Sequence, residues 1–313
     1  MTTAVVFGYH NVGVRGLAVL LAAGVKVALV VTHRDSPTEH IWFESVGALA
    51  TLHGIRVVAP DEPNTPEFIA EMAGLKPDFI FSFYYRMMLS PALLATATRG
   101  AYNLHGSLLP KYRGRVPINW AIIKGETKTG ATLHEMAQKP DAGRIFGQQA
   151  VPILPNDTAL DVFTKVVVAA ELTLHRALPA LLDGTAIGIA QELTQGSYFG
   201  GRKPDDGVID WRDSAATIHN LVRAVAPPYP GASTTINGAS LKIYRTLPAP
   251  AHFTHTNPGI LVVSEERVIA LAGDGKMLRV LEAELDGQTH NEVMLAARLG
   301  IGRYPLGLPL EAT

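Results

Sequence analysis

Between residue 4 and about residue 182, short β-branched apolar runs alternate with longer segments of helical period. This alternation limits the possible folds more than any other feature, because it is typical of a mostly parallel sheet covered by helices. The expected strands are AVVFG, VKVALVVT, IRVVAP, DFIFSFYY and AYNLH, at 4–8, 25–32, 55–60, 78–85 and 101–105. We therefore predict a doubly wound α/β domain.

Local capping residues predict two of the helices in this region. One helix is expected to begin directly after Ser36 and Pro37. A long one is expected from Asp157 to Leu182, with Gly184 as its C-cap because glycine adopts the left-handed conformation of that position readily.

The pattern changes after GGRKPDDG at 200–207. A helix follows in which apolar residues recur at i, i+3, i+4 and i+7, namely Ile218, Leu221, Val222 and Val225. Strands then dominate, and the pairs Asn237-Gly238 and Asp274-Gly275 are typical of tight hairpins with positive φ. We predict a first domain at 1–203 and a smaller barrel-like β domain at 204–313.

Composition excludes several classes of protein. The 313 residues contain no cysteine, which removes disulfides, thiol nucleophiles and cysteine-bearing metal sites. A formal net charge of −1 disfavours a nucleic-acid partner. The N-terminus lacks a basic targeting region, and Gly24 and Lys26 interrupt the most apolar stretch before it reaches spanning length. We predict a cytoplasmic protein without membrane insertion.

The stretch NLHGSLLPKYRGRVPINW, at 103–120, concentrates the candidate functional residues. In an extended segment Asn103 and His105 point to the same side, at the carboxyl end of an expected strand, where ligand crevices of doubly wound sheets lie. Alternatively, both side chains merely satisfy strand-end hydrogen bonds. The cations that follow are Lys111, Arg113 and Arg115, which suit a phosphate or a carboxylate or belong to a solvated, flexible loop.

Three other motifs are weaker. The glycines of GYHNVGVRG at 8–16 lack the spacing of a dinucleotide motif and favour a tight strand–helix turn, with a nucleotide-sugar contact as the alternative. HEMAQ at 134–138 has Gln138 where a zinc helix needs its second histidine, so no metal site is predicted. Tyr198 and Phe199, before Arg202 and Lys203, either stack on a uracil or pack between domains.

Asn103, His105, SLLPKYRG and the downstream TGATLHEMAQKPDAG at 129–143 resemble the formyltransferases that use 10-formyltetrahydrofolate. That resemblance implies a Rossmann-like N-terminal domain and an OB-like C-terminal barrel. Within the family the likeness is greatest to enzymes that formylate UDP-4-amino-4-deoxy-L-arabinose, in lipid A modification, lipopolysaccharide biosynthesis and polymyxin resistance. The stretches that indicate this acceptor are FSFYYR (81–86), NLHGSLLPKYRGR (103–115), PINW (117–120), DAG (141–143), FGGRKPDD (199–206) and RAVAPPYPGA (223–232).

The resemblance also implies roles for individual residues. Asn103 would hydrogen-bond the oxyanion, His105 would transfer a proton, and Asp141 would be the carboxylate that supports the histidine. The expected folate contacts are Met87, Met88, Leu89, Arg115, Ala137, Gln138, Lys139 and Pro140. Met87 and Met88 depart from the side chains expected there, which matters little if those contacts are made by the backbone.

Other functions stay open at the level of sequence. The acceptor could be another UDP- or dTDP-linked amino sugar or methionyl-tRNA, and a folate- or nucleotide-binding module without catalysis is the non-enzymatic alternative. The residues that contact the sugar nucleotide are not identified. The sequence also leaves open a homo-oligomer and a place within a larger bifunctional protein.

Overall fold

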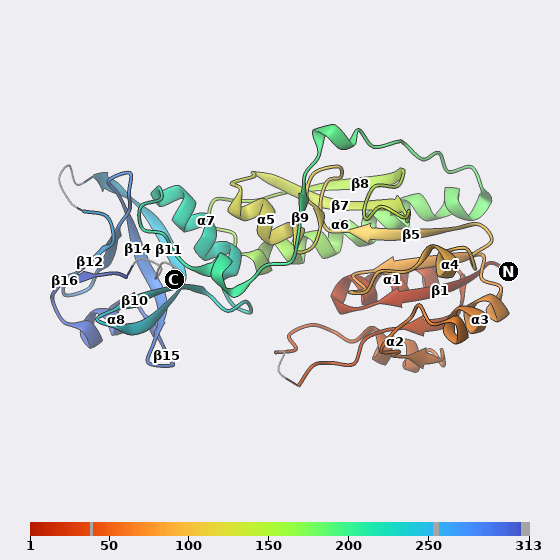
Figure 1. The fold of residues 1–313 in the computed structure, drawn as a ribbon, viewed down its shortest axis with the longest axis horizontal. Helices are drawn as coiled ribbons and strands as arrows, with labels where there is room; N and C mark the ends of the chain where they lie inside the picture. Colours follow the sequence, from red (N-terminus) through yellow and green to blue (C-terminus); the bar gives the residue numbers. More distant parts are fainter. Residues whose placement is uncertain (38–39, 253–256, 308–313) are drawn as a thin grey trace. The chain divides into compact units, whose positions relative to one another are not determined.

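The computed structural model describes residues 1–37, 40–252 and 257–307, which form two compact units (Figure 1). The first unit comprises Met1–Pro117, Lys128–Val151 and Thr164–Gly200. The second comprises Ile118–Thr127, Pro152–Phe163 and the chain from Gly201 onward. Residues 118–127 and 152–163 thus lie within the predicted first domain of 1–203 in sequence but group with the second unit.

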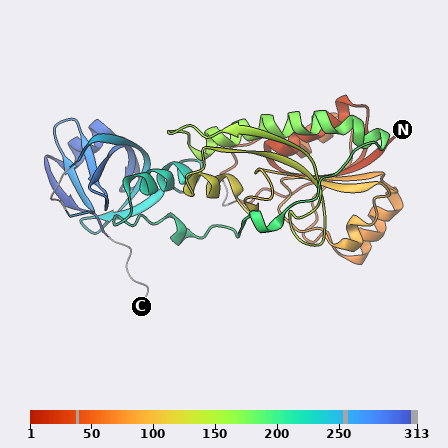
Figure 2. The same cartoon turned by 90° about the horizontal axis from the view of Figure 1, so that it is seen from above.

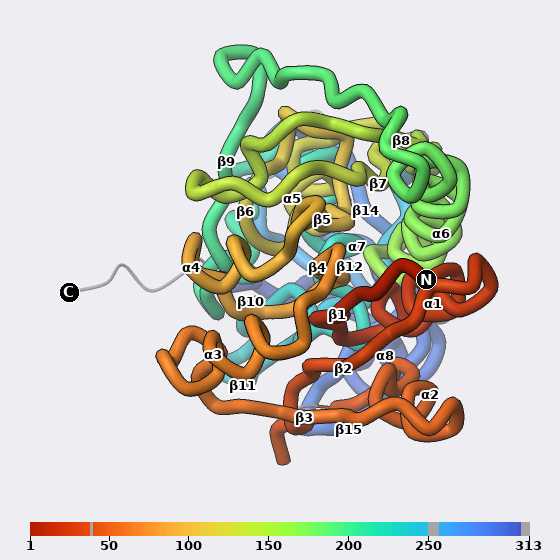
Figure 3. The backbone as a smooth tube through the Cα atoms, turned by 90° about the vertical axis from the view of Figure 1, so that its right-hand side faces the viewer, coloured from red at the N-terminus to blue at the C-terminus, as the bar shows by residue number. Residues whose placement is uncertain are grey.

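A seven-stranded sheet in the order β3-β2-β1-β4-β5-β7-β8 forms the first unit, as the tube in Figure 3 shows from its edge. The strands β1 to β5 are parallel, whereas β7 runs antiparallel to β5. The predicted doubly wound, mostly parallel sheet is confirmed. Its strands are β1 Thr3–Gly8, β2 Lys26–Val31, β3 Val57–Val58, β4 Phe79–Phe83, β5 Gly100–His105, β7 Lys128–Glu135 and β8 Ile145–Pro152.

Helices cover both faces of this sheet: α1, α2 and α6 lie on one side and α3 and α4 on the other (Figure 3). Their bounds are α1 His10–Ala22, α2 Val46–Leu52, α3 Pro66–Leu75, α4 Pro91–Leu94 and α6 Ala159–Asp183. Alternate residues of β1, Val5 and Phe7, pack with Met72 of α3 and Leu93 of α4 in a buried cluster. Burial of large apolar side chains of this kind contributes roughly 1.5–3 kcal/mol each.

The long helix α6 agrees with its prediction and lies along the sheet in Figure 2. It begins at Ala159 because Thr158 and Asp161 form reciprocal side-chain-to-backbone hydrogen bonds of 3.2 and 2.9 Å. It ends at Asp183, and Gly184 follows with a φ of 81°.

The helix expected directly after Pro37 is wrong in its start. That position falls on residues 38–39, which lie outside the described residues, and α2 begins only at Val46. Ser45 caps it by accepting a hydrogen bond from the amide of Ala48 at 3.2 Å. In the segment before this helix, Phe43 stacks on the ring of His10, with centroids 3.8 Å apart.

The second unit is a curled antiparallel sheet in the order β10-β11-β14-β13-β12-β16. An isolated bridge between Ile236 and Leu306 joins its two ends, so the sheet closes into the predicted barrel-like form, which Figure 2 shows. Its elements are α5 Pro117–Ile123, α7 Ala215–Val225, β10 Ala232–Ile236, β11 Ala239–His252, β12 Ile260–Val263, β13 Val268–Leu271, β14 Lys276–Leu285, β15 Gln288–Asn291, α8 Glu292–Leu299 and β16 Gly302–Pro305.

The hairpin turns follow the sequence signals with one exception and one addition. Asn237-Gly238 joins β10 and β11 with φ values of 51° and 79°, as predicted. At Asp274-Gly275 only the glycine has a positive φ, because a longer turn connects β13 to β14. Asp286-Gly287 makes a further tight turn, with φ of 53° and 73°, that the sequence analysis did not predict although the dipeptide signal was present.

Short elements complete the chain. β6 (Arg113–Gly114) and β9 (Tyr198–Phe199) form a two-stranded parallel sheet in the first unit. Two 3₁₀ turns, Leu193–Gln195 and Pro204–Gly207, flank the junction at residue 200. Within the described ranges, none of the helices combines the length and the apolar character needed to cross a lipid bilayer.

Candidate active site

The pairing of β5 with β7 places four polar side chains on one face of the sheet. Asn103 lies directly opposite His134, and His105 directly opposite Thr132. Opposite residues of an antiparallel pair point to the same face, and residues two apart on one strand do so as well. The predicted pair Asn103 and His105 therefore shares its face with a second histidine.

Asn103 and His134 are in direct contact. The amide Nδ2 of Asn103 lies 3.0 Å from Nε2 of His134, and Nδ1 of the same ring lies 2.9 Å from the carbonyl oxygen of Glu135. A carbonyl oxygen only accepts hydrogen bonds, so Nδ1 carries the proton and Nε2 accepts from Asn103. In the part of the chain that the structure describes, the second hydrogen of the Asn103 amide has no partner.

Asp141 meets both histidines from the loop between β7 and β8. Its Oδ1 lies 3.6 Å from Nδ1 of His105 and 3.4 Å from Nε2 of His134. Its Oδ2 accepts a hydrogen bond of 2.8 Å from the amide of Gly114. The structure thus brings together the three residues Asn103, His105 and Asp141, which are separated by up to 38 positions in the sequence.

The loop that carries Asp141 is held at two points. Gln191 donates from Nε2 to the carbonyl oxygens of Asp141 and Gly143, at 2.9 and 2.7 Å. A Cβ atom at position 143 would lie 1.9 Å from the carbonyl oxygen of Glu135, so the close approach of the loop to β7 requires glycine. These contacts determine where the carboxylate lies.

Both ring nitrogens of His105 face protein groups. Its Nε2 donates to the carbonyl oxygen of Tyr112 at 2.8 Å, and its Nδ1 faces Asp141. The side chain is only 7% exposed. Burial lowers the pKa of His105, and this effect outweighs the opposing influence of the Asp141 carboxylate and the Tyr112 carbonyl. The neutral imidazole is therefore favoured.

The carboxyl of Asp141, unlike the ring of His105, favours its charged form. Burial alone would raise its pKa, but the two histidines and the amide of Gly114 together lower the pKa of Asp141 well below its usual range. The group is a carboxylate at neutral pH. Its charge therefore opposes the effect of burial on the pKa of His105.

The loop at 106–115 is tied to β7. Thr132 donates from Oγ1 to the carbonyl oxygen of Ser107 at 2.6 Å and accepts from the amide of Leu109 at 3.1 Å. Of the three cations in this stretch, Lys111 and Arg115 are exposed, whereas Arg113 is buried. Only the first two can meet an anion in bulk solvent.

The residues predicted to contact folate fall into three groups. Met87 and Met88 follow β4 and are exposed, whereas the side chain of Leu89 belongs to the buried core. Asn64 accepts from the amide of Ser90 at 2.7 Å and donates to the carbonyl oxygen of Met88 at 2.9 Å, which fixes the backbone there.

The other predicted folate contacts lie beside Asp141 and after β6. Ala137, Gln138 and Lys139 are exposed, and Pro140 is half-buried next to Asp141. Arg115 is exposed and its amide donates to the carbonyl oxygen of Phe199 at 2.9 Å. Their contact with folate stays a prediction.

The weaker motifs have packing roles in the structure. A Cβ atom at Gly16 would lie 2.5 Å from the ring of Phe83, so this glycine lets α1 pack closely on the sheet. Phe199 stacks on Tyr112 with centroids 5.4 Å apart, while Tyr198 is exposed. Among the residues that the structure describes, no group of histidine and carboxylate side chains is arranged to hold a metal ion.

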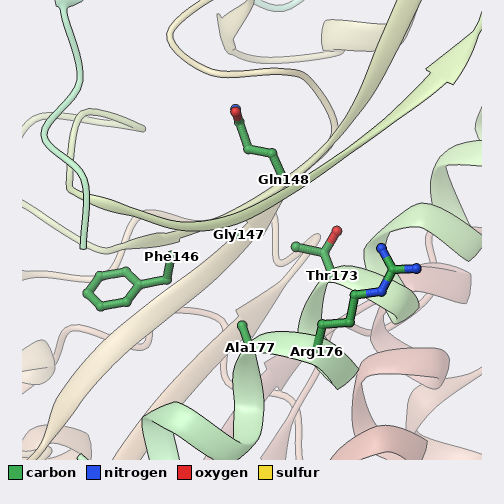
Figure 4. Close-up of a pocket in the computed structure, with 6 residues that line it drawn as sticks. All are labelled: Phe146, Gly147, Gln148, Thr173, Arg176 and Ala177. Atoms are coloured by element: carbon green, nitrogen blue, oxygen red, sulfur yellow. The ribbon is translucent and has the colours of Figure 1, made fainter. Parts of the chain in front are cut away.

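A small cavity of about 170 Å³ lies elsewhere, between β8 and α6 (Figure 4). It is lined by Phe146, Gly147, Gln148, Thr173, Arg176 and Ala177. Figure 4 shows the side chain of Gln148 pointing away from the helix, and it donates to Leu109 and Thr132 instead. None of the candidate catalytic residues lines this cavity.

Sequence reasoning missed His134 and Gln191. His134 was considered only as the first ligand of a zinc helix, whereas it lies on the strand β7. The alternation of Thr132 and His134 in TGATLHE was a usable strand signal, but nothing local indicates which strand lies opposite. Gln191 lies in an irregular segment and carries no sequence signal for its contact with the Asp141 loop.

Two family models match this chain. A family model described as formyl transferase matches residues 18–178, and one described as formyl transferase, C-terminal domain, matches residues 202–294.

Solved structures with the same fold include an N-formyltransferase from Helicobacter canadensis in complex with folinic acid and dTDP-3-aminofucose (TM-score 0.72, 23% identity, 90% of this chain and 99% of that chain). WlaRD, a sugar 3N-formyl transferase solved with dTDP and 5-N-formyl-THF, has a TM-score of 0.70 and 20% identity over 92% of this chain and 99% of its own. HypX from Aquifex aeolicus in complex with tetrahydrofolic acid has a TM-score of 0.62 and 19% identity over 94% of this chain and 46% of its own.

Proposed function

We propose that this chain, which belongs to the formyl transferase family, transfers the formyl group of 10-formyltetrahydrofolate to the amine of a nucleotide-linked amino sugar. The observation that carries the proposal is the Asn103 amide, which among the described residues keeps one N–H without a partner and shares a face of the sheet with His105. Half-exposed, oriented donors of this kind suit a reaction in which an oxygen gains negative charge.

Asn103 would stabilise the developing oxyanion. When the sugar amine adds to the formyl carbon, the carbonyl oxygen takes the negative charge, and the remaining N–H of Asn103 can donate to it. Single donors of this type are worth roughly 2.7–4 kcal/mol in other enzymes. The amide is held for that task because its first N–H is already bonded to His134.

His105 would supply the proton that the departing folate nitrogen needs. Both of its nitrogens are occupied in this conformation, so Nε2 must exchange the Tyr112 carbonyl for the substrate. Catalytic hydrogen bonds commonly form only when the substrate is bound. Positioned acids and bases contribute about 10²–10⁴ to the rate.

When Nε2 leaves the Tyr112 carbonyl, the ring proton would move to Nδ1 and hydrogen-bond Asp141. Nε2 could then take up the proton released by the attacking amine and pass it to the folate nitrogen, while Asp141 balances the charge of the ring. Oδ1 of Asp141 faces Nδ1 of His105 at 3.6 Å, and the lowered pKa of Asp141 keeps the carboxyl ionised. An adjacent carboxylate favours the imidazolium and orients the ring.

The residues around this site are compatible with a folate co-substrate. 10-Formyltetrahydrofolate supplies an activated one-carbon group, and the backbone of Met87 to Leu89, held by Asn64, together with Arg115 and residues 137–140 would hold it. The likeness to structures solved with folinic acid and 5-N-formyl-THF supports this assignment. If these contacts are made by backbone groups, the departure of Met87 and Met88 from the side chains expected there should matter little.

The acceptor that we favour is the 4-amine of UDP-4-amino-4-deoxy-L-arabinose. Support comes from the stretches FSFYYR, FGGRKPDD and RAVAPPYPGA, which resemble enzymes acting on that sugar in the cytoplasmic stage of lipid A modification. A dTDP-linked amino sugar is the second candidate, because two similar structures were solved with dTDP-3-aminofucose or dTDP.

The test is formylation by the purified full-length protein, followed by mass spectrometry. We expect an N-formylated sugar from 10-formyltetrahydrofolate and UDP-4-amino-4-deoxy-L-arabinose. Asn103→Ala should lower kcat by about 10²–10³, and His105→Gln by about 10²–10⁴. The exposed His175 of α6 provides the matched control, since His175→Gln should leave kcat unchanged.

Other acceptors are run in parallel. If only dTDP-linked amino sugars give a product, dTDP replaces UDP as the nucleotide of the proposed acceptor. If only methionyl-tRNA gives a product, the sugar acceptor is refuted. The absence of formylated product from all of these acceptors, with an active folate preparation, would refute the proposed function.

A further inference from the structure

We propose that His134 is a positioning residue whose neutral ring determines which end of the Asn103 amide faces the reacting oxygen. The inference rests on the proposed function, because it assigns a task to Asn103. It starts from the contact between the Asn103 Nδ2 and the His134 Nε2, 3.0 Å apart at opposed positions of β5 and β7.

The tautomer of His134 follows from its surroundings. Nδ1 lies 2.9 Å from the carbonyl oxygen of Glu135, the next residue on β7, and that oxygen can only accept. The proton therefore lies on Nδ1. Nε2 lies closer to the Asn103 amide nitrogen, at 3.0 Å, than to Oδ1 of Asp141, at 3.4 Å, so the proposal assigns Nε2 a lone pair that accepts from Asn103. The ring is 2% exposed, so solvent cannot compete for these contacts.

A lone pair at Nε2 selects the orientation of the amide. With Nδ2 toward the ring, Asn103 donates a hydrogen bond; with Oδ1 toward the ring, two lone pairs would face each other in a buried place. Leaving a buried polar group without its partner costs about 1–3 kcal/mol, which corresponds to a roughly 5- to 150-fold preference. The neutral ring therefore keeps the nitrogen of Asn103 in place and leaves its second N–H for the substrate.

The charged neighbours explain why the neutral state matters. Asp141, with Oδ1 3.4 Å from Nε2, and the ring of His105, with its centroid 6.4 Å away, are the titratable groups that face His134. Glu135 and Arg144 form an ion pair of 2.9 Å, and alternation along β7 turns Glu135 to the opposite face. A proton on Nε2 would pair with Asp141 and would reverse the preferred orientation of Asn103.

The kinetic test uses two substitutions at His134 and a double-mutant cycle. His134→Leu removes the acceptor and should lower kcat by about 10- to 100-fold, a partial loss of a single oxyanion donor, with KM for 10-formyltetrahydrofolate within about two-fold of the wild type. His134→Gln retains an acceptor near the Nε2 position and should recover most of that loss. In an Asn103→Ala background, His134→Leu should cost less than about three-fold, because it acts through the absent amide.

The opposite results would overturn the inference. These are an unchanged kcat in His134→Leu, an equal loss in the Leu and Gln variants, or full additivity of His134→Leu with Asn103→Ala. If the role of His134 were merely structural, His134→Leu and His134→Gln would lower the melting temperature equally. The effect of His134→Leu on kcat would then be the same with and without the Asn103 amide.

A second measurement does not depend on turnover. In ¹⁵N-labelled full-length protein, imidazole nitrogen shifts should show His134 as a neutral ring with its proton on Nδ1 at pH 7, the resonance being assigned by its loss in His134→Gln. A ring protonated on Nε2 overturns the inference even if His134→Leu fails to fold. Wild-type protein that forms no product with any acceptor refutes the proposed function instead, so the two failures are distinguishable.

Discussion

At the scale of residues, the candidate site depends on where the protons lie among three ionisable side chains, those of His105, His134 and Asp141. His105 is kept neutral by burial, whereas Asp141 is kept ionised by the contacts that surround it. Groups with these opposite tendencies, side by side, are the arrangement expected of an acid and its supporting carboxylate. Their shifted pKa values also make the stability of the protein depend on pH.

The first prediction concerns acid sensitivity. The pKa values of both His105 and Asp141 are lowered on folding, so the unfolded chain binds protons that these folded groups resist. The free energy of unfolding should therefore fall as pH drops, first below about 6.5 through His105 and then below about 4 through Asp141. Each unit of lowered pKa corresponds to about 1.4 kcal/mol.

Melting temperatures between pH 7 and pH 3 measure this effect. Asp141→Asn should flatten the acid part of the curve below about pH 4. Asp205→Asn, which removes an exposed carboxylate, serves as the matched control and should keep the wild-type slope. Identical slopes for Asp141→Asn and the wild type would contradict the prediction.

At the scale of elements, the site depends on the pairing of β5 with β7, the point at which the strand direction in the sheet reverses. β7 runs antiparallel to β5 and leads directly into the loop that carries Asp141. Gln191 and the close approach of Gly143 to Glu135 hold that loop in place. The loop is therefore the element most sensitive to small steric changes.

The second prediction tests this sensitivity. Gly143→Ala would place a methyl group 1.9 Å from a backbone oxygen, so the loop must move. We expect a loss of about 1–3 kcal/mol in the free energy of unfolding and, because Asp141 is displaced, up to about 10²-fold in kcat.

Urea unfolding and formylation kinetics measure both effects. Gly74→Ala in α3, where the added methyl meets no atom within 4 Å, is the matched control. It should be neutral or slightly stabilising, because alanine is the better helix former. Wild-type stability and kcat in Gly143→Ala would refute the role assigned to the loop.

At the scale of the whole molecule, the two compact units do not divide the chain at a single point. Residues 118–127 and 152–163 precede the predicted boundary at 203 but pack within the second unit. Asn119 donates to the carbonyl oxygen of Ala224 at 2.7 Å, and His219 donates from Nε2 to that of Pro155 at 3.0 Å. A cut at 203 would remove these partners.

The third prediction follows from this interleaving. A fragment of residues 1–203 contains the whole candidate site, yet it exposes Ile118, Ile122 and Phe163, which are buried in the full chain. We expect its melting temperature to lie about 10 °C or more below that of the full chain, because several kcal/mol of burial and the partner of a buried amide are lost. Differential scanning calorimetry of the fragment, with the full chain as control, measures both melting temperatures. Equal melting temperatures would favour an independent domain ending at 203.

Sequence alone determined the features that depend on neighbours along the chain. Apolar periodicity predicted the parallel strands and α6. A buried face requires an apolar residue at every second position of a strand and at every third or fourth position of a helix. Asn103 and His105 were assigned to one face because strand geometry has a period of two. The start of α2 was missed because Ser45, rather than Ser36, caps the helix, and a serine signal by itself does not distinguish the two positions.

Tertiary structure alone decided which distant residues meet. The family resemblance suggested Asp141, but its 3.6 Å approach to His105, the contact of Asn103 with His134 and the clamp by Gln191 depend on the pairing of β5 with β7 and on the loop that follows. No local conformational preference encodes such pairings. They result from the burial and hydrogen bonding of the whole sheet, which only the folded chain provides.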